Sequence, residues 1–127
     1  MKRLILFELI ILFLATTFES DSPPGWFQQT IAIGNKLITD IQFIDTSNGW
    51  VITDWGPSFD TAYIFKTSDG GSNWEFQYRY PVSFTAINMV NSNTGYASGG
   101  TGFGRLFKTT NGGTNWNLIY TAGHLFN

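Results

Sequence analysis

The chain has 127 residues, a formal net charge of −2 and 13% charged residues, well below the usual share of about 25%. Its few basic residues are scattered, so the sequence lacks the basic stripe of a nucleic-acid-binding protein, and we expect no nucleic acid partner. The sequence has no cysteine, which excludes disulfides and thiolate metal sites, and no motif for a cofactor or a metal is found.

Residues 1–20 have the composition of a signal peptide. Lys2 and Arg3 form a charged start, and residues 4–15 are apolar apart from Glu8. This run is shorter than the roughly 20 apolar residues that span a bilayer. The pattern therefore predicts a signal peptide and export, either to the medium, to the cell surface or to the periplasm.

Residues 21–36 are predicted to form a spacer followed by a lone strand. Pro23, Pro24 and Gly25 indicate a turn. Trp26 then precedes an apolar run, as a tryptophan does at the start of the last strand of two later units. We therefore expect this strand to be the fourth strand of a sheet whose other strands lie outside this part of the chain.

Residues 37–82 are predicted to form one four-stranded antiparallel unit. Ile41 and Phe43 show the period-two alternation of a strand, and the run that ends at Gly49 is a strong turn signal. No helical periodicity occurs after residue 20. The expected strands of this unit cover residues 37–43, 50–53, 63–66 and 74–78.

Residues 83–124 repeat this unit at a spacing of 42 to 46 residues, and residues 125–127 match the start of a third unit. The expected strands cover residues 84–89, 96–98, 105–108 and 116–120. Four antiparallel strands in about 42–46 residues is the pattern of a β-propeller blade. The sequence therefore predicts an all-β fold with two complete blades and parts of two others.

The same eight-residue motif ends the third strand of both units, as TSDGGSNW from residue 67 and as TTNGGTNW from residue 109. Its threonine and its Asp or Asn offer oxygens to the N–H groups of a turn, and its glycines supply backbone angles that a side chain penalises. We expect a structural role for Thr67, Asp69, Gly71 and Trp74, and for Thr109, Asn111, Gly113 and Trp116.

This motif resembles the Asp-box of BNR repeats, (S/T)-x-D-x-G-x-(T/S/N)-W. Together with ITDIQFIDTSNGWVIT and the preceding GWFQQTIAIGNKL, it makes residues 25–127 similar to secreted bacterial BNR propellers related to the photosystem II assembly and stability factor-like family. The resemblance implies a propeller whose boxes lie away from its active face. Asn111 departs from the box, so a charge-based role cannot be shared by both copies.

A candidate ligand rim is expected where the first unit has four extra residues, after its second strand. Trp55 and Phe59 could stack on a sugar ring, and Asp54 and Asp60 flank them. The other interpretation is an insertion whose aromatic residues cover the blade edge. The full candidate rim consists of Asp54, Trp55, Phe59, Asp60, Arg79 and Tyr80, beside the loop Gly99–Gly104.

Propellers of this kind serve several functions, so a shared fold does not assign one. The first interpretation is a non-catalytic exported scaffold that binds a protein or a glycan. The alternatives are a fragment of a polysaccharide-active glycoside hydrolase and a photosystem II assembly factor-like chaperone. Sialidases also carry this box, but their chemistry needs three arginines, and only Arg79 and Arg105 remain beyond the signal region. No catalytic residue is identified. Propeller rings close with about four to eight blades, whereas two complete blades are predicted here. We therefore expect that the chain can also associate with itself through its open blade edges.

Overall fold

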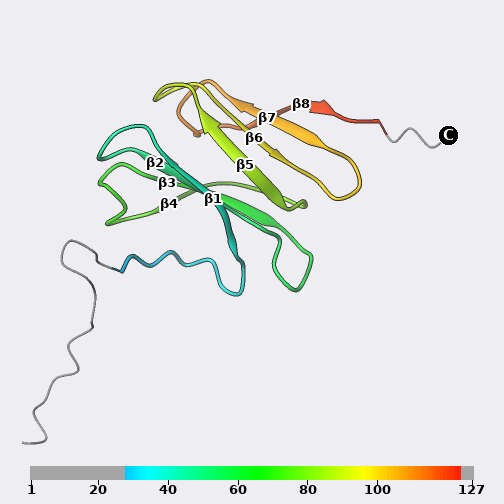
Figure 1. Cartoon of the computed structure of the whole chain (residues 1–127), viewed down its shortest axis with the longest axis horizontal. Coiled ribbons are helices and arrows are strands. Elements are labelled where there is room, and N and C mark those ends of the chain that lie inside the picture. The colour runs from blue at the N-terminus through cyan, green and yellow to red at the C-terminus, as the bar shows by residue number, and fades with distance from the viewer. Residues whose placement is uncertain (1–27, 124–127) are drawn as a thin grey trace, which may run out of the picture.

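The computed structural model describes residues 28–123, and within this range the chain forms two four-stranded antiparallel sheets and no helix (Figure 1). Within each sheet, the strands pair in the order in which they follow one another along the chain. This confirms the predicted all-β class. The first sheet consists of β1 (Ile38–Phe43), β2 (Gly49–Thr53), β3 (Ala62–Thr67) and β4 (Glu75–Tyr80). The second sheet consists of β5 (Phe84–Met89), β6 (Gly95–Gly99), β7 (Arg105–Thr109) and β8 (Asn117–Thr121).

The two sheets have the same register. Ile41 lies opposite Val51 in the first sheet, as Ile87 lies opposite Ala97 in the second. Both sheets have one irregularity at the start of the first strand and another between the third and fourth strands. A bulge re-aims the side chains that follow it, so residues at the same register position point to the same side of their sheets.

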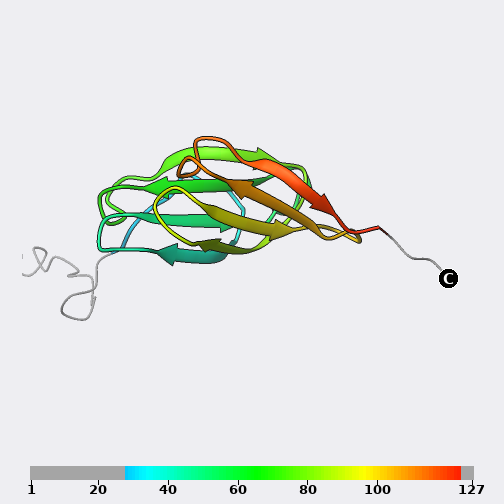
Figure 2. The same cartoon turned by 90° about the horizontal axis from the view of Figure 1, so that it is seen from above.

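Each sheet has two faces with different residues. We call the face that carries Trp74 or Trp116 the tryptophan face, and the face that carries Lys66 or Lys108 the lysine face. The lysine face of the first sheet packs against the tryptophan face of the second, and the sheets overlap when the molecule is seen from above (Figure 2). The buried cluster between them contains Trp50, Ile52, Ala62, Ile64, Val82, Phe84, Ile87, Met89, Ala97, Phe107 and Trp116.

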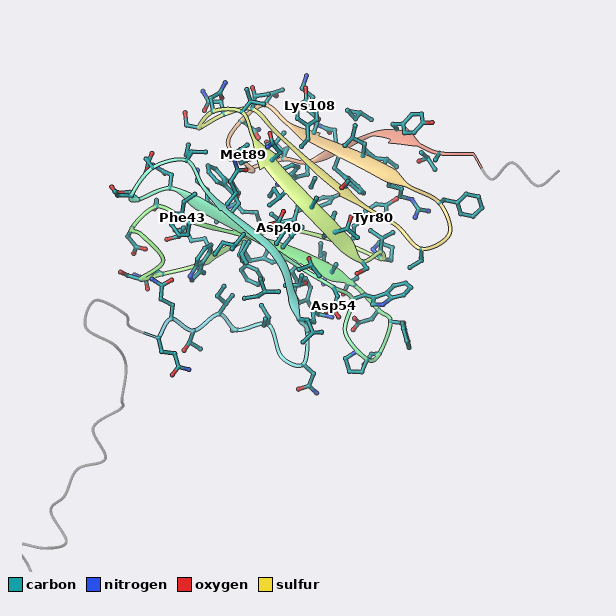
Figure 3. The ribbon with its side chains drawn as sticks, viewed as in Figure 1. Asp40, Phe43, Asp54, Tyr80, Met89 and Lys108 are labelled. Carbon is teal, nitrogen blue, oxygen red and sulfur yellow. The ribbon has the colours of Figure 1, made fainter. Side chains whose placement is uncertain are left out.

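The edge strands β1 and β5 lie side by side (Figure 3). Side chains rather than a backbone ladder join them. The side-chain amide of Gln42 accepts a hydrogen bond from the N–H of Met89 at 2.5 Å and donates one to the carbonyl oxygen of Met89 at 3.2 Å. The Asp40 carboxylate accepts a hydrogen bond from the N–H of Ile87 at 2.9 Å. Two polar side chains therefore satisfy backbone groups that an edge strand leaves unpaired.

The structure corrects one expectation at the start of the chain. Residues 28–36 form no strand, although a lone fourth strand was expected there. A strand needs a partner for its backbone groups, and this segment instead runs along the side of the first sheet that is remote from the second (Figure 1). The predicted signal peptide over residues 1–20, Trp26 and the predicted start of a third unit lie outside the described residues.

The two box tryptophans also differ slightly from expectation. Trp74 and Trp116 were expected to begin the fourth strands, but these strands begin one residue later, at Glu75 and Asn117. The tryptophans close the turns instead, and their indole N–H groups are buried with no hydrogen-bond acceptor among the described residues.

Candidate functional site

The first box forms a closed turn around two side chains. The Thr67 hydroxyl donates a hydrogen bond to the Asp69 carboxylate at 2.8 Å and accepts one from the N–H of Gly71 at 2.8 Å. The same carboxylate accepts hydrogen bonds from the backbone N–H and the side-chain amide of Asn73, each at 2.8 Å. Gly70 and Gly71 have φ angles of 71° and 92°, a region that glycine enters without strain.

The second box makes the same turn without an acid. The Thr109 hydroxyl donates a hydrogen bond to the Asn111 side-chain oxygen at 3.1 Å and accepts one from the N–H of Gly113 at 2.9 Å. The Asn111 oxygen also accepts a hydrogen bond from the N–H of Asn115 at 2.9 Å. Every one of these oxygens is used within the turn, which fits the structural role expected for both boxes.

The β2–β3 loop brings four of the six candidate rim residues together. Trp55 and Phe59 meet edge to face, with ring centroids 5.0 Å apart. Asp54 has a structural task, because its carboxylate accepts hydrogen bonds from the N–H groups of Leu37 at 2.7 Å and Gly56 at 3.1 Å. The loop conformation therefore depends on Asp54, while the aromatic pair lies outside that network.

Phe59 has an unusual backbone. Its φ angle of 50° is the one positive value at a non-glycine residue in the described chain, and a bulky residue is rarely found in this region. Its side chain is 69% exposed. The fold would accept a glycine here with less strain, so the sheet core gives no reason for an aromatic residue at this position.

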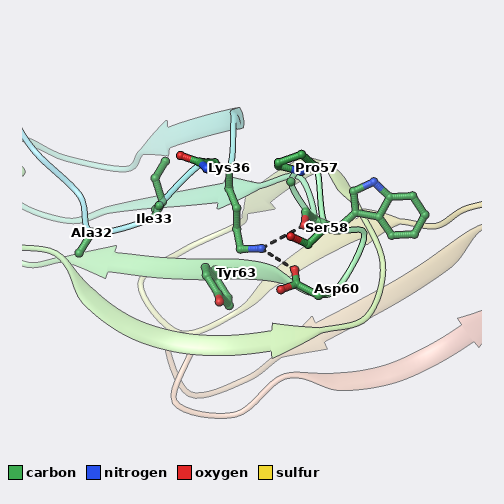
Figure 4. A pocket seen from close by; sticks show the side chains of 11 residues that line it. Ala32, Ile33, Lys36, Pro57, Ser58, Asp60 and Tyr63 are labelled. Carbon is green, nitrogen blue, oxygen red and sulfur yellow. Dashed lines mark hydrogen bonds and ion pairs between the residues drawn. The ribbon is translucent and has the colours of Figure 1, made fainter.

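A pocket of about 290 Å³ lies between residues 32–36 and the β2–β3 loop, with Tyr63 at its base (Figure 4). The Lys36 ammonium group donates hydrogen bonds to the Asp60 carboxylate at 2.7 Å and to the Trp55 carbonyl oxygen at 3.0 Å. It also lies 4.8 Å from the centroid of the Tyr63 ring. We call this site the loop pocket. It combines an ion pair with aromatic rings, the mixed lining that is typical of ligand sites.

The electrostatics of the loop pocket favour a charged carboxylate. The hydrogen bond from Lys36 lowers the pKa of Asp60, and the N–H of Thr61 lowers it further. A general acid at neutral pH needs the opposite shift, a raised pKa. Asp60 is therefore suited to an ion pair and to accepting hydrogen bonds.

The remaining rim candidates are placed differently. Tyr80 packs against the core between the sheets, where its ring lies 4.9 Å from the ring of Phe107. Arg79 is exposed on β4 and lies opposite Tyr63 in the register. The loop Gly99–Gly104 belongs to the second sheet and does not line the loop pocket. The six residues therefore do not form one continuous rim.

Lys36 and Tyr63 are functional candidates that the sequence interpretation missed. Lys36 precedes β1, and Asp60 follows it by 24 residues, so no local motif joins them. The strand order alone could have indicated the pair. In an antiparallel sheet the start of β1 and the end of β2 lie at the same end of the sheet, so residues that precede β1 lie near the β2–β3 loop. In the part of the chain that the structure describes, no three His, Cys, Asp or Glu residues lie close enough to hold a metal ion.

Comparison with known proteins finds no protein-family model that matches the chain and no curated protein that matches it.

Proposed function

We propose that the chain is part of an exported Asp-box β-propeller that serves as a non-catalytic scaffold for binding a protein or a glycan, with the loop pocket as its ligand site. The two sheets support the propeller assignment because each is a four-stranded antiparallel meander with the same register and the same box turn. The boxes use their oxygens internally. Ligand contacts are therefore assigned to the β2–β3 loop.

Phe59 is the observation that carries this proposal: it does not line the loop pocket itself but pairs with Trp55, which does. Its exposed side chain stands on a strained backbone, and its ring meets only the neighbouring Trp55 among the aromatic residues described. Strained backbone conformations are concentrated at functional sites. An aromatic pair beside Lys36 and Asp60 offers a ligand both a stacking surface and hydrogen bonds, which is the pattern that sugar rings and peptide side chains require.

The hydrolase alternative receives no support from this loop. A glycosidase needs one carboxyl group as a general acid and a second as a base or nucleophile. Asp54 accepts two backbone hydrogen bonds, and Asp60 is paired with Lys36 and has a lowered pKa. Asp60 is therefore held as the charged carboxylate, and Asp54 is engaged in holding the loop backbone. Export and the photosystem-related alternative rest on the sequence resemblance alone.

Phe59→Gly tests the proposal because it separates binding from stability. Glycine relieves the backbone strain at the positive φ angle of residue 59. The substitution also removes the aromatic contact with Trp55, which contributes about 0.5–1.5 kcal/mol. These two effects oppose each other, so the net change in stability should be small. Binding should weaken by about 1–3 kcal/mol, the scale of an aromatic hot spot. Calorimetric titration of the full chain with a glycan and peptide panel measures this.

Phe103→Ala is the matched control, because Phe103 is a partly exposed aromatic residue in the corresponding loop of the second sheet. It should leave binding unchanged. If a ligand binds equally well to the wild type and to Phe59→Gly, the Trp55–Phe59 pair beside the loop pocket is not its binding surface. If no ligand in the panel binds, the aromatic pair is cover for the sheet edge.

A further inference from the structure

The two sheets of this chain leave one copy of each contact face unmatched. Inside the molecule, the lysine face of the first sheet covers the tryptophan face of the second, where Phe84, Ile87 and Met89 are 0%, 6% and 4% exposed. The first sheet has Ile38, Ile41 and Phe43 at the same register positions. There they are 49%, 51% and 40% exposed, so within residues 28–123 the tryptophan face of the first sheet lacks the cover that its counterpart has.

The lysine face of the second sheet is open in turn. Its residues match those that make the internal contact: Tyr96 stands in the place of Trp50, and Lys108 in the place of Lys66. The lysine lies over the aromatic ring in both sheets, 5.1 Å from the ring centroid of Trp50 and 5.7 Å from that of Tyr96. Ile119 and Tyr120, which stand in the places of Gln77 and Tyr78, are 49% and 61% exposed.

The hydrogen-bonding groups of the internal contact also recur. The indole N–H of Trp50 donates to the Gly112 carbonyl oxygen at 3.2 Å, and the corresponding acceptor in the first box is the Gly70 carbonyl. In the second sheet, the Tyr96 hydroxyl is the group that could donate a hydrogen bond to the Gly70 carbonyl oxygen of another copy. Asn88 takes the register position of Gln42, whose amide bridges to the next sheet.

Residues 28–31 occupy part of this docking surface. The Gln29 side-chain amide donates to the Gly70 carbonyl oxygen at 2.9 Å, and its oxygen lies against Gly71 as the Gln77 oxygen lies against Gly113. Ile31, with Gln28 and Gln29, also lines a hollow over Ile38, Ile41 and Trp74. The segment therefore takes the place at the first box that a neighbouring sheet takes at the second.

We propose that copies of this chain dock head to tail, with the lysine face of the second sheet of one copy on the tryptophan face of the first sheet of the next. Docking displaces Gln29 from the Gly70 carbonyl, so residues 28–31 compete with it. Two different faces meet, so the contact is heterologous and closes a ring when the rotation allows. Rings of about two to four copies would contain the four to eight sheets typical of propellers.

The contact between copies is more polar than the contact within one. Ser98 stands in the place of Ile52, and Ala86 in the place of Asp40. The contact between copies therefore buries less apolar surface than the contact within one copy, and it lacks the hydrogen bond that Asp40 makes to the edge strand. We expect reversible association that depends on concentration, rather than a permanent assembly.

Two substitutions at exposed positions test the proposal, with the mass of the full chain measured by analytical ultracentrifugation over a wide concentration range. Ile41→Lys blocks the tryptophan face, and Ile119→Glu blocks the lysine face. Each variant alone should be a monomer, while a mixture of the two should form dimers and nothing larger, because one intact pair of faces remains. Val90→Lys, at a residue that is 64% exposed in a turn, is the control and should associate like the wild type.

Gln29→Ala supplies a test of opposite sign that loss of folding cannot imitate. It removes the hydrogen bond that holds the competing segment, so association should become tighter. A wild-type monomer at every concentration would overturn the proposal and favour a different partner for the two faces. Association that persists in both single variants, as it would through the apolar residues 4–15, would overturn it as well.

Discussion

Thr109→Val removes the buried hydroxyl around which the second box closes. The Thr109 side chain is 0% exposed, and its hydroxyl accepts the N–H of Gly113 at 2.9 Å and donates to Asn111 at 3.1 Å. Valine keeps the shape of threonine and opens no cavity. It leaves the buried N–H of Gly113 without an acceptor, which costs about 1–3 kcal/mol.

Equilibrium urea unfolding, followed by tryptophan fluorescence, measures this loss. A change of this size also lowers the melting temperature, by roughly 4–8 °C for each kcal/mol in a domain of this size. Thr109→Ser should retain most of the stability because it keeps the hydroxyl. Thr110→Val, at the exposed neighbouring position, should stay within about 0.5 kcal/mol of the wild type. If Thr109→Val were no less stable than Thr110→Val, the box would not depend on this hydroxyl.

Two further predictions concern charge. The pKa of Asp69 lies below its ordinary value of 3.8, mainly because its carboxylate accepts a hydrogen bond from the backbone N–H of Asn73, and then because of the Asn73 side-chain amide and the Thr67 hydroxyl. The contribution of Asp69 to stability is therefore present above pH 3.8 and is lost as the pH falls through the lower, folded-state pKa. Asp69→Asn should be less stable than the wild type at neutral pH and equal to it in acid, and acid-to-neutral urea titrations in which the difference stays constant would contradict this. Lys36→Met should return the pKa of Asp60 toward its ordinary value, because the hydrogen bond from Lys36 is the largest cause of its lowering. An NMR titration of the Asp60 carboxyl group measures the shift, with Lys66→Met as the control that should leave it unchanged.

Local features of the fold could be predicted from the sequence. The strands alternate in hydrophobicity, and each box contains its own donors and acceptors within a few residues, from Thr67 to Asn73. A turn of this kind forms from its own residues. Both box turns, and the strand positions to within one or two residues, were therefore accessible without any knowledge of the tertiary structure.

Contacts between distant residues could not be predicted in this way. Gln42 bonds to the backbone of Met89, 47 residues away, and nothing near either residue marks the pair. Tyr80 looked like a rim residue because it ends β4 beside the loops, but the second sheet covers it. Residues 28–36 have the sequence of a strand, yet they remain irregular because no neighbouring strand pairs with them.

The meander order of both sheets has a consequence for how the chain folds. Every strand pairs with the strand before or after it in the sequence, so only short loops need to close before a sheet can form. Folding rates rise as contacts become more local. All-β proteins usually fold slowly because their strands pair with strands that are distant in the sequence. We therefore expect this chain to fold faster than a β-sandwich of equal length, with each sheet forming as a local unit. The slower step would be the docking of β1 on β5, since the Asp40 and Gln42 bonds join residues 47 positions apart.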